Sequence, residues 1–175
     1  MTKQDIPFLP IYFERYINQV PDMELPKALE VYGFELLDAE KNKLIQLGDL
    51  VYAPDKWTIA DIMQHVIDTE RIFAYRALRI GRNDQTPLPG FDENEYAVQA
   101  HASERSFEDL INEFVTVRQS TIQLFKSFKP EDLLKQGIGS GNPISVIGLG
   151  YTIVGHVIHH MEVIKERYYP LINVK

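Results

Sequence analysis

Apolar residues recur at spacings of three and four along most of the 175-residue chain, which is the pattern of amphipathic helices. The sequence lacks the series of short alternating runs and hairpin turns that indicates a sheet protein. It therefore predicts an all-α fold.

Capping residues, glycines and prolines divide this pattern into four long helical regions, at roughly residues 9–46, 58–81, 106–130 and 142–168. The first is interrupted near Val20-Pro21 and restarts with Pro26 in a first turn. Thr58 and Asp61 resemble a capping box at the start of the second. We expect Pro130 to close the third, and Asn142 with Pro143 to start the last. Four long helices with short to moderate connections predict a four-helix bundle, formed by a single domain over residues 1–175.

Two connections and three glycines need separate explanations. The segment QTPLPGFDENEY, residues 85–96, is either a plain connector or part of a pocket rim. KQGIGSG, residues 135–141, is interpreted as a flexible linker, because no strand precedes it and no Gly-Lys-Ser/Thr follows, as a phosphate-binding loop would require. Gly148, Gly150 and Gly155 each cost about 1 kcal/mol inside a helix relative to alanine. They predict a close neighbouring helix or room beside a ligand.

Composition excludes several classes of function. A net charge of −7 without a basic cluster argues against nucleic-acid binding. No apolar run approaches the roughly 20 residues of a membrane span. The start MTKQDIPFLP lacks the pattern of a signal peptide, and there is no cysteine, so we expect a cytoplasmic protein. Without thiolates, any transition metal must bind to imidazole or carboxylate.

Three of the five histidines lie close together, in the stretch GHVIHHMEVIKERYY. On a helix, His156 and His160 are one turn apart on the same face, with Cβ atoms about 5–6 Å from each other. Two such imidazoles can bind one metal ion. The alternative is a pair of core histidines that bond to backbone carbonyls. His159 points about 60° away from His156 and is expected to support the site or to pack beside it.

A third ligand would decide between these alternatives, and His65 is the candidate. It lies in the middle of the second helical region, on a stripe with Ile62, Thr69 and Ile72 that should face the core. Three imidazoles would leave a fourth position open, which is typical of a catalytic site. A metal there can lower the pKa of a bound water or thiol. The alternative interpretation, in which the histidines only pack in the core and bind no metal, is equally compatible with the sequence at this point.

Two familiar metal chemistries do not fit the sequence. A zincin places glutamate directly after its first helical histidine, whereas Val157 follows His156. A carboxylate-bridged di-iron bundle needs two Glu-x-x-His units, and the chain has none. A mononuclear three-histidine site remains.

The segments KWTIADIMQHVIDTERIFAYRAL and GHVIHHMEVIKERY, in that order and far apart, closely resemble the DinB superfamily, including its YfiT-like metal-dependent hydrolases and thiol S-transferases. The resemblance spans most of the chain and implies a four-helix bundle. It also implies a divalent metal, zinc or nickel, bound by one histidine of the second helix and two of the last. Carried over, these ligands are His65, His156 and His160.

The resemblance implies a reaction on a small electrophilic molecule, either hydrolysis or the transfer of a low-molecular-weight thiol such as bacillithiol or mycothiol. A noncatalytic, stress-associated metal-binding bundle is the alternative, and it would lack a substrate-sized pocket beside the metal. The third possibility is a structural helical dimer with packed histidines and no metal. The sequence leaves room for a homodimer in any of these cases.

Some further residues have two interpretations each. Arg76 and Arg167 lie eleven residues after His65 and His156, so they could hold an anionic substrate group or instead reach solvent near helix ends. Asp61 and Asp68 could orient an imidazole or act as a base, or they could be capping or surface residues.

Two other side chains are expected to have no part in the chemistry. We assign Trp57, at the start of the first DinB-like segment, to core packing. His101 lies in a polar region where a helix begins and is given no role.

Overall fold

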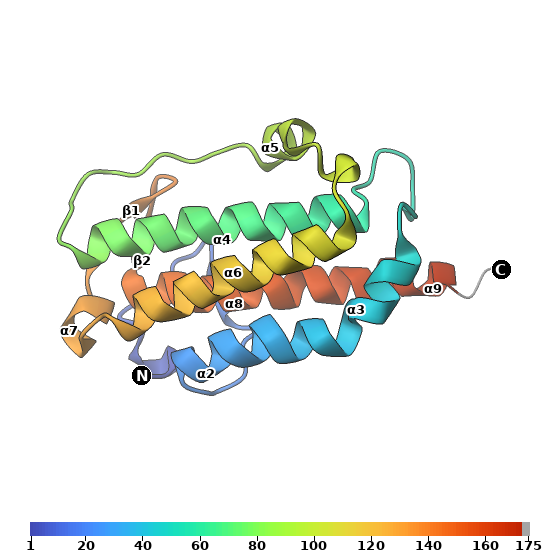
Figure 1. Ribbon diagram of the computed structural model, residues 1–175. Coiled ribbons are helices and arrows are strands. Elements are labelled where there is room, and N and C mark those ends of the chain that lie inside the picture. The colour runs from blue at the N-terminus through green and yellow to red at the C-terminus, as the bar shows by residue number, and fades with distance from the viewer. Residues whose placement is uncertain (173–175) are drawn as a thin grey trace.

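The computed structural model describes residues 1–172, so the last three residues of the predicted domain lie outside the described part. Most of the described chain is helical, and its elements are shown in Figure 1. In chain order they are η1 (Lys3–Asp5), α1 (Glu14–Ile17), α2 (Leu25–Glu30), η2 (Val31–Glu35), α3 (Leu36–Leu47), α4 (Ile59–Gly81), α5 (Glu93–Ala100), η3 (Ala102–Glu104), α6 (Phe107–Lys126), α7 (Pro130–Leu133), β1 (Gln136–Gly139), β2 (Asn142–Ser145), α8 (Val146–Val163), η4 (Ile164–Tyr168) and α9 (Tyr169–Ile172).

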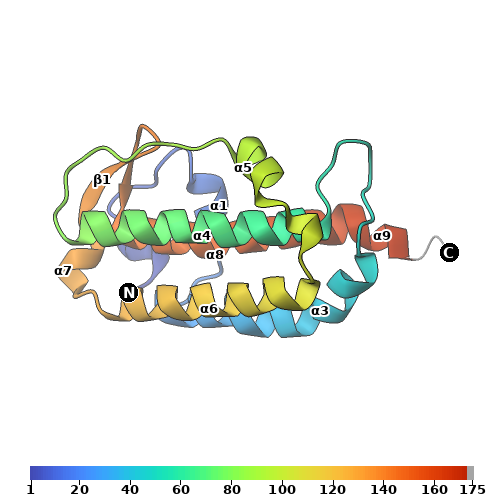
Figure 2. The same ribbon diagram turned by 45° about the horizontal axis from the view of Figure 1, so that its top comes forward.

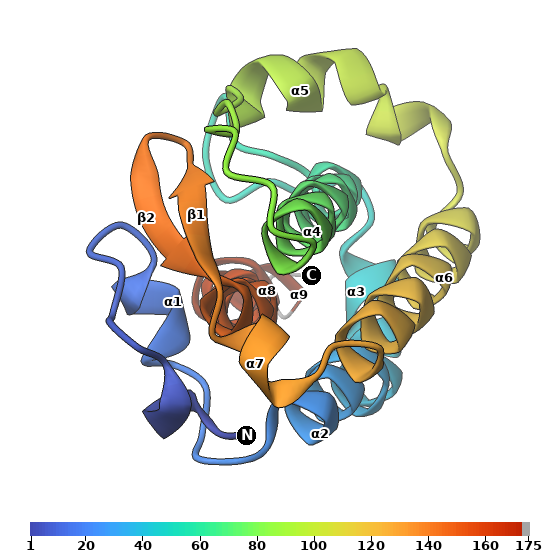
Figure 3. The same cartoon turned by 90° about the vertical axis from the view of Figure 1, so that its left-hand side faces the viewer.

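Four long helical segments form a bundle, which confirms the predicted fold. They are α2 to α3 with the π-helical turn η2 between them, α4, α6, and α8 with its continuation through η4 and α9. An end-on view shows the four segments around a common centre (Figure 3). Helices α4 and α6 run in the same direction, so the connection over residues 82–106, which carries α5, returns along the outside of the bundle (Figure 1).

Local capping explains where the bundle helices begin. Thr58 Oγ1 accepts a hydrogen bond from Asp61 N at 3.2 Å, and Asp61 Oδ2 accepts one from Thr58 N at 2.9 Å. This is the capping box predicted for α4. Ser106 caps α6 by accepting from Asp109 N, also as predicted. The predicted interruption of the first region is present, because α1 ends at Ile17 and Pro26 lies in the first turn of α2.

The glycine-rich linker predicted over residues 135–141 is wrong. The chain forms a β-hairpin there, in which β1 and β2 pair antiparallel with Gly139 opposite Asn142. The two turn residues, Ser140 and Gly141, have φ angles of +52° and +75°. Positive φ at both positions gives the two-residue turn whose twist matches that of paired strands. Ser140-Gly141 is therefore a hairpin turn between two short strands, a feature that helical periodicity does not identify.

Two predicted helix boundaries are also wrong. Asn142 and Pro143 belong to β2, and Ser145 caps α8 by accepting from Gly148 N at 3.1 Å. Helix α6 ends at Lys126, and Pro130 instead occupies the first turn of the separate helix α7. Each proline lies close to the end of a helix, as predicted, but Pro143 belongs to the strand before α8 and Pro130 to the helix after α6.

Helix α8 lies at the centre of the molecule, and most of its side chains are buried. Gly155 shows why glycines occur inside it, since a Cβ atom at this position would overlap the carbonyl oxygen of Tyr16 in α1. At Gly150 a Cβ would meet Leu25 of α2 and Phe125 of α6. Close approach of neighbouring helices, one of the two predicted reasons, therefore accounts for both glycines.

A buried ion pair crosses the bundle between α4 and α6. Arg118 Nε and Nη2 each donate to one carboxylate oxygen of Glu70, at 2.8 Å, and Arg118 Nη1 donates to Leu29 O at 2.9 Å. Gly33 in the π-helical turn leaves the space that the arginine fills. The helical pattern does not predict this pair, because charged residues in helices normally lie on the surface.

Among residues 1–172, no helix has both the length and the apolar character required to cross a membrane.

Candidate metal centre

The structure brings His65, His156 and His160 together between α4 and α8. The Nε2 atom of His156 lies 3.1 Å from Nε2 of His65 and 3.1 Å from Nε2 of His160. One ring nitrogen from each of the three residues lies within 4.8 Å of the other two. The helical spacing of four on α8 and the central position of His65 on α4 are what make this meeting possible.

The geometry of these nitrogens fits a shared ion. Tetrahedral coordination with Zn–N distances of about 2.0–2.1 Å places neighbouring nitrogens about 3.3 Å apart. The two short Nε2···Nε2 distances are close to this value. The Nε2 atom of His156 can form an N–H···N hydrogen bond with one of its two neighbours but not with both. One cation can accept a lone pair from each of the three rings. The residues present therefore fit a divalent metal held by three imidazoles.

Burial keeps these imidazoles in the neutral form that binds metal. Desolvation lowers the pKa of His65 to about 4 and that of His160 to about 3. The pKa of His156 is also lowered well below its ordinary value, mainly by burial and then by the neighbouring histidines. Deprotonated rings at neutral pH leave their lone pairs available to a cation.

Aromatic side chains from other segments hold the histidine rings in place. Tyr16 of α1 meets the edges of His156 and His159, with ring centroids 5.3 and 5.4 Å away. The Trp57 ring lies 4.9 Å from the His65 ring. His159 packs between Tyr16 and His160, which agrees with the supporting or packing position expected for it.

A cavity of about 250 Å³ opens beside the three histidines. Its lining includes all three rings, His159, Trp57 and Tyr16, and continues along α4 through Thr69 and Phe73 to Arg76. Phe91 and Glu93 of the 82–106 connection and Ser140 of the β-hairpin also line it. The remaining lining residues come from α1 and the segment before it: Tyr12, Phe13 and Arg15. Helix α1, the hairpin and α5 all lie on the side of α4 and α8 that faces away from α6 and α2 (Figures 2 and 3).

Of the two interpretations of segment 85–96, the structure supports a pocket rim. Phe91 and Glu93 line the histidine cavity, and α5 starts at Glu93 after Asp92 caps it. Leu88 N donates to Ile138 O at 2.9 Å, which attaches the connection to β1. An acidic side chain and an aromatic ring are therefore held beside the histidines.

Arg76 and Arg167, each eleven residues after a histidine of the cluster, differ in their surroundings. Arg76 lines the cavity and is 2% exposed, so the expectation that it reaches solvent is wrong. Arg167 is exposed, forms an ion pair with Glu166 and lies over the Tyr52 ring. It is not among the cavity-lining residues.

The two aspartates near His65 have structural partners. Asp61 belongs to the Thr58 capping box. Asp68 accepts a hydrogen bond from Gln64 at 3.0 Å and lies near Arg71. Burial raises the pKa of Asp68. Among the described residues, neither carboxylate bonds to a histidine ring.

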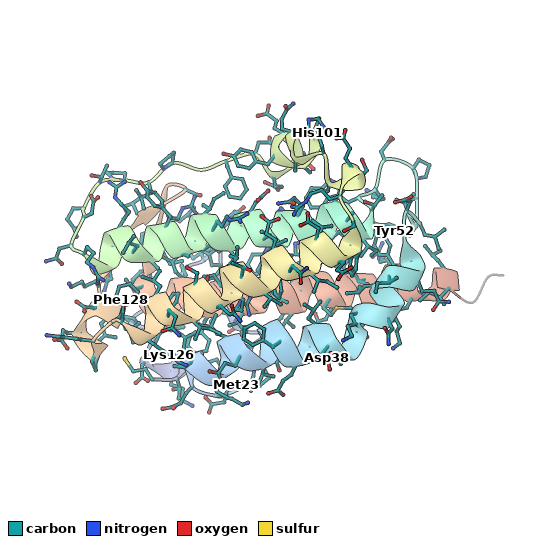
Figure 4. All side chains as sticks on the ribbon, in the orientation of Figure 1. Met23, Asp38, Tyr52, His101, Lys126 and Phe128 are labelled. Atoms are coloured by element: carbon teal, nitrogen blue, oxygen red, sulfur yellow. The ribbon has the colours of Figure 1, made fainter. Side chains whose placement is uncertain are left out.

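Trp57 and His101 occupy contrasting places. Trp57 packs against a core cluster, as predicted, and it also lines the histidine cavity. His101 is the exposed C-cap residue of α5, on the outside of the molecule (Figure 4). It is not among the residues that line the histidine cavity.

Sequence reasoning missed the lining residues that come from outside the bundle helices. Tyr16, Glu93 and Ser140 have no periodic relation to the histidines. Only indirect signals pointed to them, since Gly155 predicted a close neighbour and segment 85–96 had the composition of a rim. Their placement depends on how α1, the hairpin and the long connection fold back onto α4 and α8.

Comparisons with known proteins agree with this architecture. The structure is similar to that of YfiT from Bacillus subtilis, with a TM-score of 0.65 and 14% sequence identity over 81% of this chain and 85% of that one. YfiT is described as a probable metal-dependent hydrolase with an unusual four-helix bundle topology. At this identity the likeness shows the fold alone. No curated protein matches the sequence.

The family comparison covers the site as well as the fold. The model of the DinB superfamily matches residues 18–164, which include His65, His156 and His160. The match extends over most of the chain and includes α2, α3, α4, α6 and α8. The protein therefore belongs to the DinB superfamily.

Proposed function

We propose that this protein is a metal-dependent enzyme that activates a small nucleophile, a low-molecular-weight thiol or water, toward a small electrophilic molecule. His65, His156 and His160 would hold a divalent ion, zinc or nickel. Such an ion supplies Lewis acidity at an open fourth position. The observation that carries the proposal is the meeting of three neutral imidazoles at the wall of a substrate-sized cavity.

The cavity favours an enzyme over a noncatalytic metal-binding bundle. A structural metal site is closed by four protein ligands, whereas the cluster here offers three. The space beside it, about 250 Å³, is close to the lower end of the range for small-molecule sites. Aromatic rings and a few polar groups line it, which is the usual composition of such sites.

Glu93 supports the proposal, because it is the carboxylate among the described cavity-lining residues. It is exposed, so it can exchange protons with solvent. We assign it the role of proton acceptor. In thiol transfer the sulfur would lose its proton to this carboxylate and form the new bond to carbon, while the leaving group departs with its electron pair. In hydrolysis, water would lose the proton instead.

Elemental analysis of purified protein, followed by activity screening, tests the proposal. Protein freed of metal with a chelator would be reloaded with zinc, nickel, cobalt or manganese. Each form would then be mixed with thiols and a haloaromatic electrophile, and separately with ester and amide substrates. We expect turnover in one of the two screens that depends on the metal and falls at least tenfold in Glu93→Gln, with metal content unchanged.

The matched control is Glu95→Gln, which changes a carboxylate on the same helix that does not line the histidine cavity. It should retain full activity. Metal bound in the purified protein, with no turnover in either screen, would favour the noncatalytic alternative. Absence of bound metal and of any metal affinity would contradict the proposed function itself.

A further inference from the structure

The histidine cavity continues along α4 to a buried arginine. His65, Thr69, Phe73 and Arg76 all line it, at spacings of four, four and three. These spacings place the four side chains on one stripe of the helix. Because α-helical side chains lean toward the N-terminus of their helix, the long side chain of Arg76 extends back toward His65.

Arg76 lacks the partner that a buried arginine normally has. It is 2% exposed, and no carboxylate among residues 1–172 forms an ion pair with it. The other deeply buried arginine, Arg118, provides the comparison inside the same protein, because Glu70 pairs with both of its nitrogens. An unpaired buried charge is costly, so a cation without a counterion at a cavity wall indicates that a ligand supplies one.

Most of the hydrogen-bonding capacity of Arg76 is also unused. Its Nη2 atom donates to Pro89 O at 2.7 Å and to Ser140 Oγ at 2.9 Å. No acceptor for Nε or Nη1 is found in the described part of the chain. The Phe73 ring, 5.5 Å from Arg76 Cζ, lies against the guanidinium and fixes its position. The arginine is held in place by one nitrogen, which leaves the others available to an anion.

Two further polar groups lie along the same wall. Ser140 lines the cavity from the hairpin turn and already contacts Arg76. Thr69 is 3% exposed, and its hydroxyl oxygen has no hydrogen-bond partner in the described structure. A buried hydroxyl without a partner is uncommon, and rotation about χ1 can turn it toward a bound molecule.

We infer that Arg76 and Ser140 form a subsite for a carboxylate group of the substrate whose reacting end meets the three histidines. The inference rests on the proposed function and adds a substrate class to it, small organic molecules with one negative charge. One guanidinium with a single hydroxyl beside it matches a monoanion. The cavity's other charged lining residues are Arg15 and Glu93, so no excess of negative charge opposes such a group.

Distances within the site limit the length of such a substrate. Arg76 Cζ lies 5.5 Å from the Phe73 ring centroid, which in turn lies 6.4 Å from the His156 ring centroid. The guanidinium carbon is therefore at most about 12 Å from the His156 ring. A chain of a few carbon atoms between the reacting group and the carboxylate spans this interval.

Bifunctional thiols test the subsite directly. Cobalt-loaded protein would be titrated with 3-mercaptopropionate, 4-mercaptobutyrate and 6-mercaptohexanoate, and with the mercapto-alcohols of the same lengths. The thiolate-to-cobalt absorption band reports binding at the histidines. We expect one of the acids to bind about ten- to a hundredfold more tightly than its alcohol, which is the effect of one charge-assisted hydrogen-bonded pair.

Arg76→Gln should abolish this preference and leave the affinity for the alcohol unchanged. Arg76→Lys should keep part of it, and Ser140→Ala should weaken it, so the test survives if one variant fails to fold. Arg167→Gln is the matched control, because Arg167 is exposed and does not line the cavity. It should behave as the wild type.

A measurement without metal separates the subsite from the metal chemistry. Saturation-transfer NMR on chelated protein should show hexanoate binding more strongly than hexanol, and Arg76→Gln should remove the difference. No preference for acids in the wild type, or an unchanged preference in Arg76→Gln, would overturn the subsite while the proposed function stands. Cobalt-loaded protein that binds no thiol of either kind, yet distinguishes hexanoate from hexanol, would instead support the subsite and count against thiol transfer.

Discussion

At the scale of single residues, neighbouring histidines on one helix differ in what they can bind. His156 and His160 present Nε2 atoms to each other at 3.1 Å, whereas His159 packs against Tyr16. At about 100° per residue, His160 lies about 40° from His156 around the helix axis, whereas His159 lies about 60° from His156 on the other side and therefore about 100° from His160. The residue type is the same in all three cases, so position on the helix decides which ring joins the cluster.

Replacement of single histidines should therefore have unequal effects. We expect His65→Ala, His156→Ala and His160→Ala each to lower zinc or nickel affinity by at least tenfold, because each removes one of three imidazoles. His159→Ala should keep metal content near normal. The single tryptophan, Trp57, packs on the His65 ring, so quenching of its fluorescence by nickel measures binding at this site. Equal loss of metal in His159→Ala and His160→Ala would show that the ligand set was chosen wrongly.

At the scale of elements, close approach of α1 to α8 depends on a missing side chain. Alanine at position 155 would favour the helical state by about 1 kcal/mol, but its Cβ would overlap the backbone oxygen of Tyr16. The Tyr16 oxygen is a backbone atom and cannot rotate away as a side chain can, so α1 has to move away from α8. We expect Gly155→Ala to lower the free energy of unfolding by about 1–3 kcal/mol, as overpacking does, and to weaken metal binding by displacing Tyr16.

Urea denaturation and nickel titration of the same samples would measure both effects. Gly90→Ala is the control, since a Cβ there would meet Ser140 at 3.5 Å, an ordinary contact distance. It should leave stability within about 0.5 kcal/mol of the wild type. A Gly155→Ala variant as stable as the wild type would show that α1 is not fixed against α8.

The buried pair of α4 and α6 allows a second test at this scale. Glu70→Gln would leave Arg118 as a buried cation without its counterion, and we expect a loss of about 3–5 kcal/mol in unfolding free energy. The control is Glu30→Gln, which breaks an exposed pair between Lys126 of α6 and Glu30 of α2. That change should cost no more than about 1 kcal/mol. Denaturant unfolding of both variants would measure the two losses of unfolding free energy. Losses of similar size would contradict the prediction that the buried ion pair matters more than the exposed one.

The sequence predicted the bundle elements well and the elements outside the bundle poorly, for a physical reason. Periodicity and capping are local, so Thr58, Ser106 and the stripe that carries His65 could be identified from the letters. The hairpin around Ser140 depends on two residues with positive φ, and its packing onto α4 is a contact across more than 60 residues. Helical periodicity contains no information about such contacts.

The candidate site shows the same division. Helical geometry indicated that His156 and His160 share a face and that His65, on a core-facing stripe, is the candidate third ligand, and the resemblance to the DinB superfamily implied the same three residues. The environment of Arg76 could not be predicted, because its position near the end of a helix suggested exposure. It is buried because residues outside the bundle, Pro89 and Ser140, cover it.

At the scale of the whole molecule, the histidine cluster links stability to both pH and metal. Burial lowers the pKa of His65 to about 4 and that of His160 to about 3 in the folded chain, against about 6.5 when unfolded. The unfolded chain then binds more protons in acid, so the contribution to stability is present above pH 6.5 and is lost as the pH falls through the folded pKa values. For His65 the loss is on the order of 2 kcal/mol at pH 5.

A metal that binds only the folded state adds to this dependence. At a free concentration of 100 times Kd it stabilises the fold by about 2.7 kcal/mol, which in a protein of this size corresponds to about 5–10 °C in Tm. Protons compete with the ion only where the folded imidazoles titrate, so we expect the difference in Tm between metal-loaded and chelated protein to persist from pH 7.5 to pH 5 and to shrink as the pH falls toward 4 and below. Thermal melts of both forms across this range would measure it.

The triple variant with alanine at positions 65, 156 and 160 separates the two contributions. It should lose the response to chelator at every pH, because none of the three imidazoles that hold the ion remains. It should also show a weaker acid-induced loss of stability than chelated wild type, because the buried groups that disfavour protonation are gone. Equal Tm values for loaded and chelated wild type, after removal of metal has been verified, would mean that the bundle holds the three rings together without help from an ion. The cluster would then be a preformed site whose metal serves chemistry rather than folding.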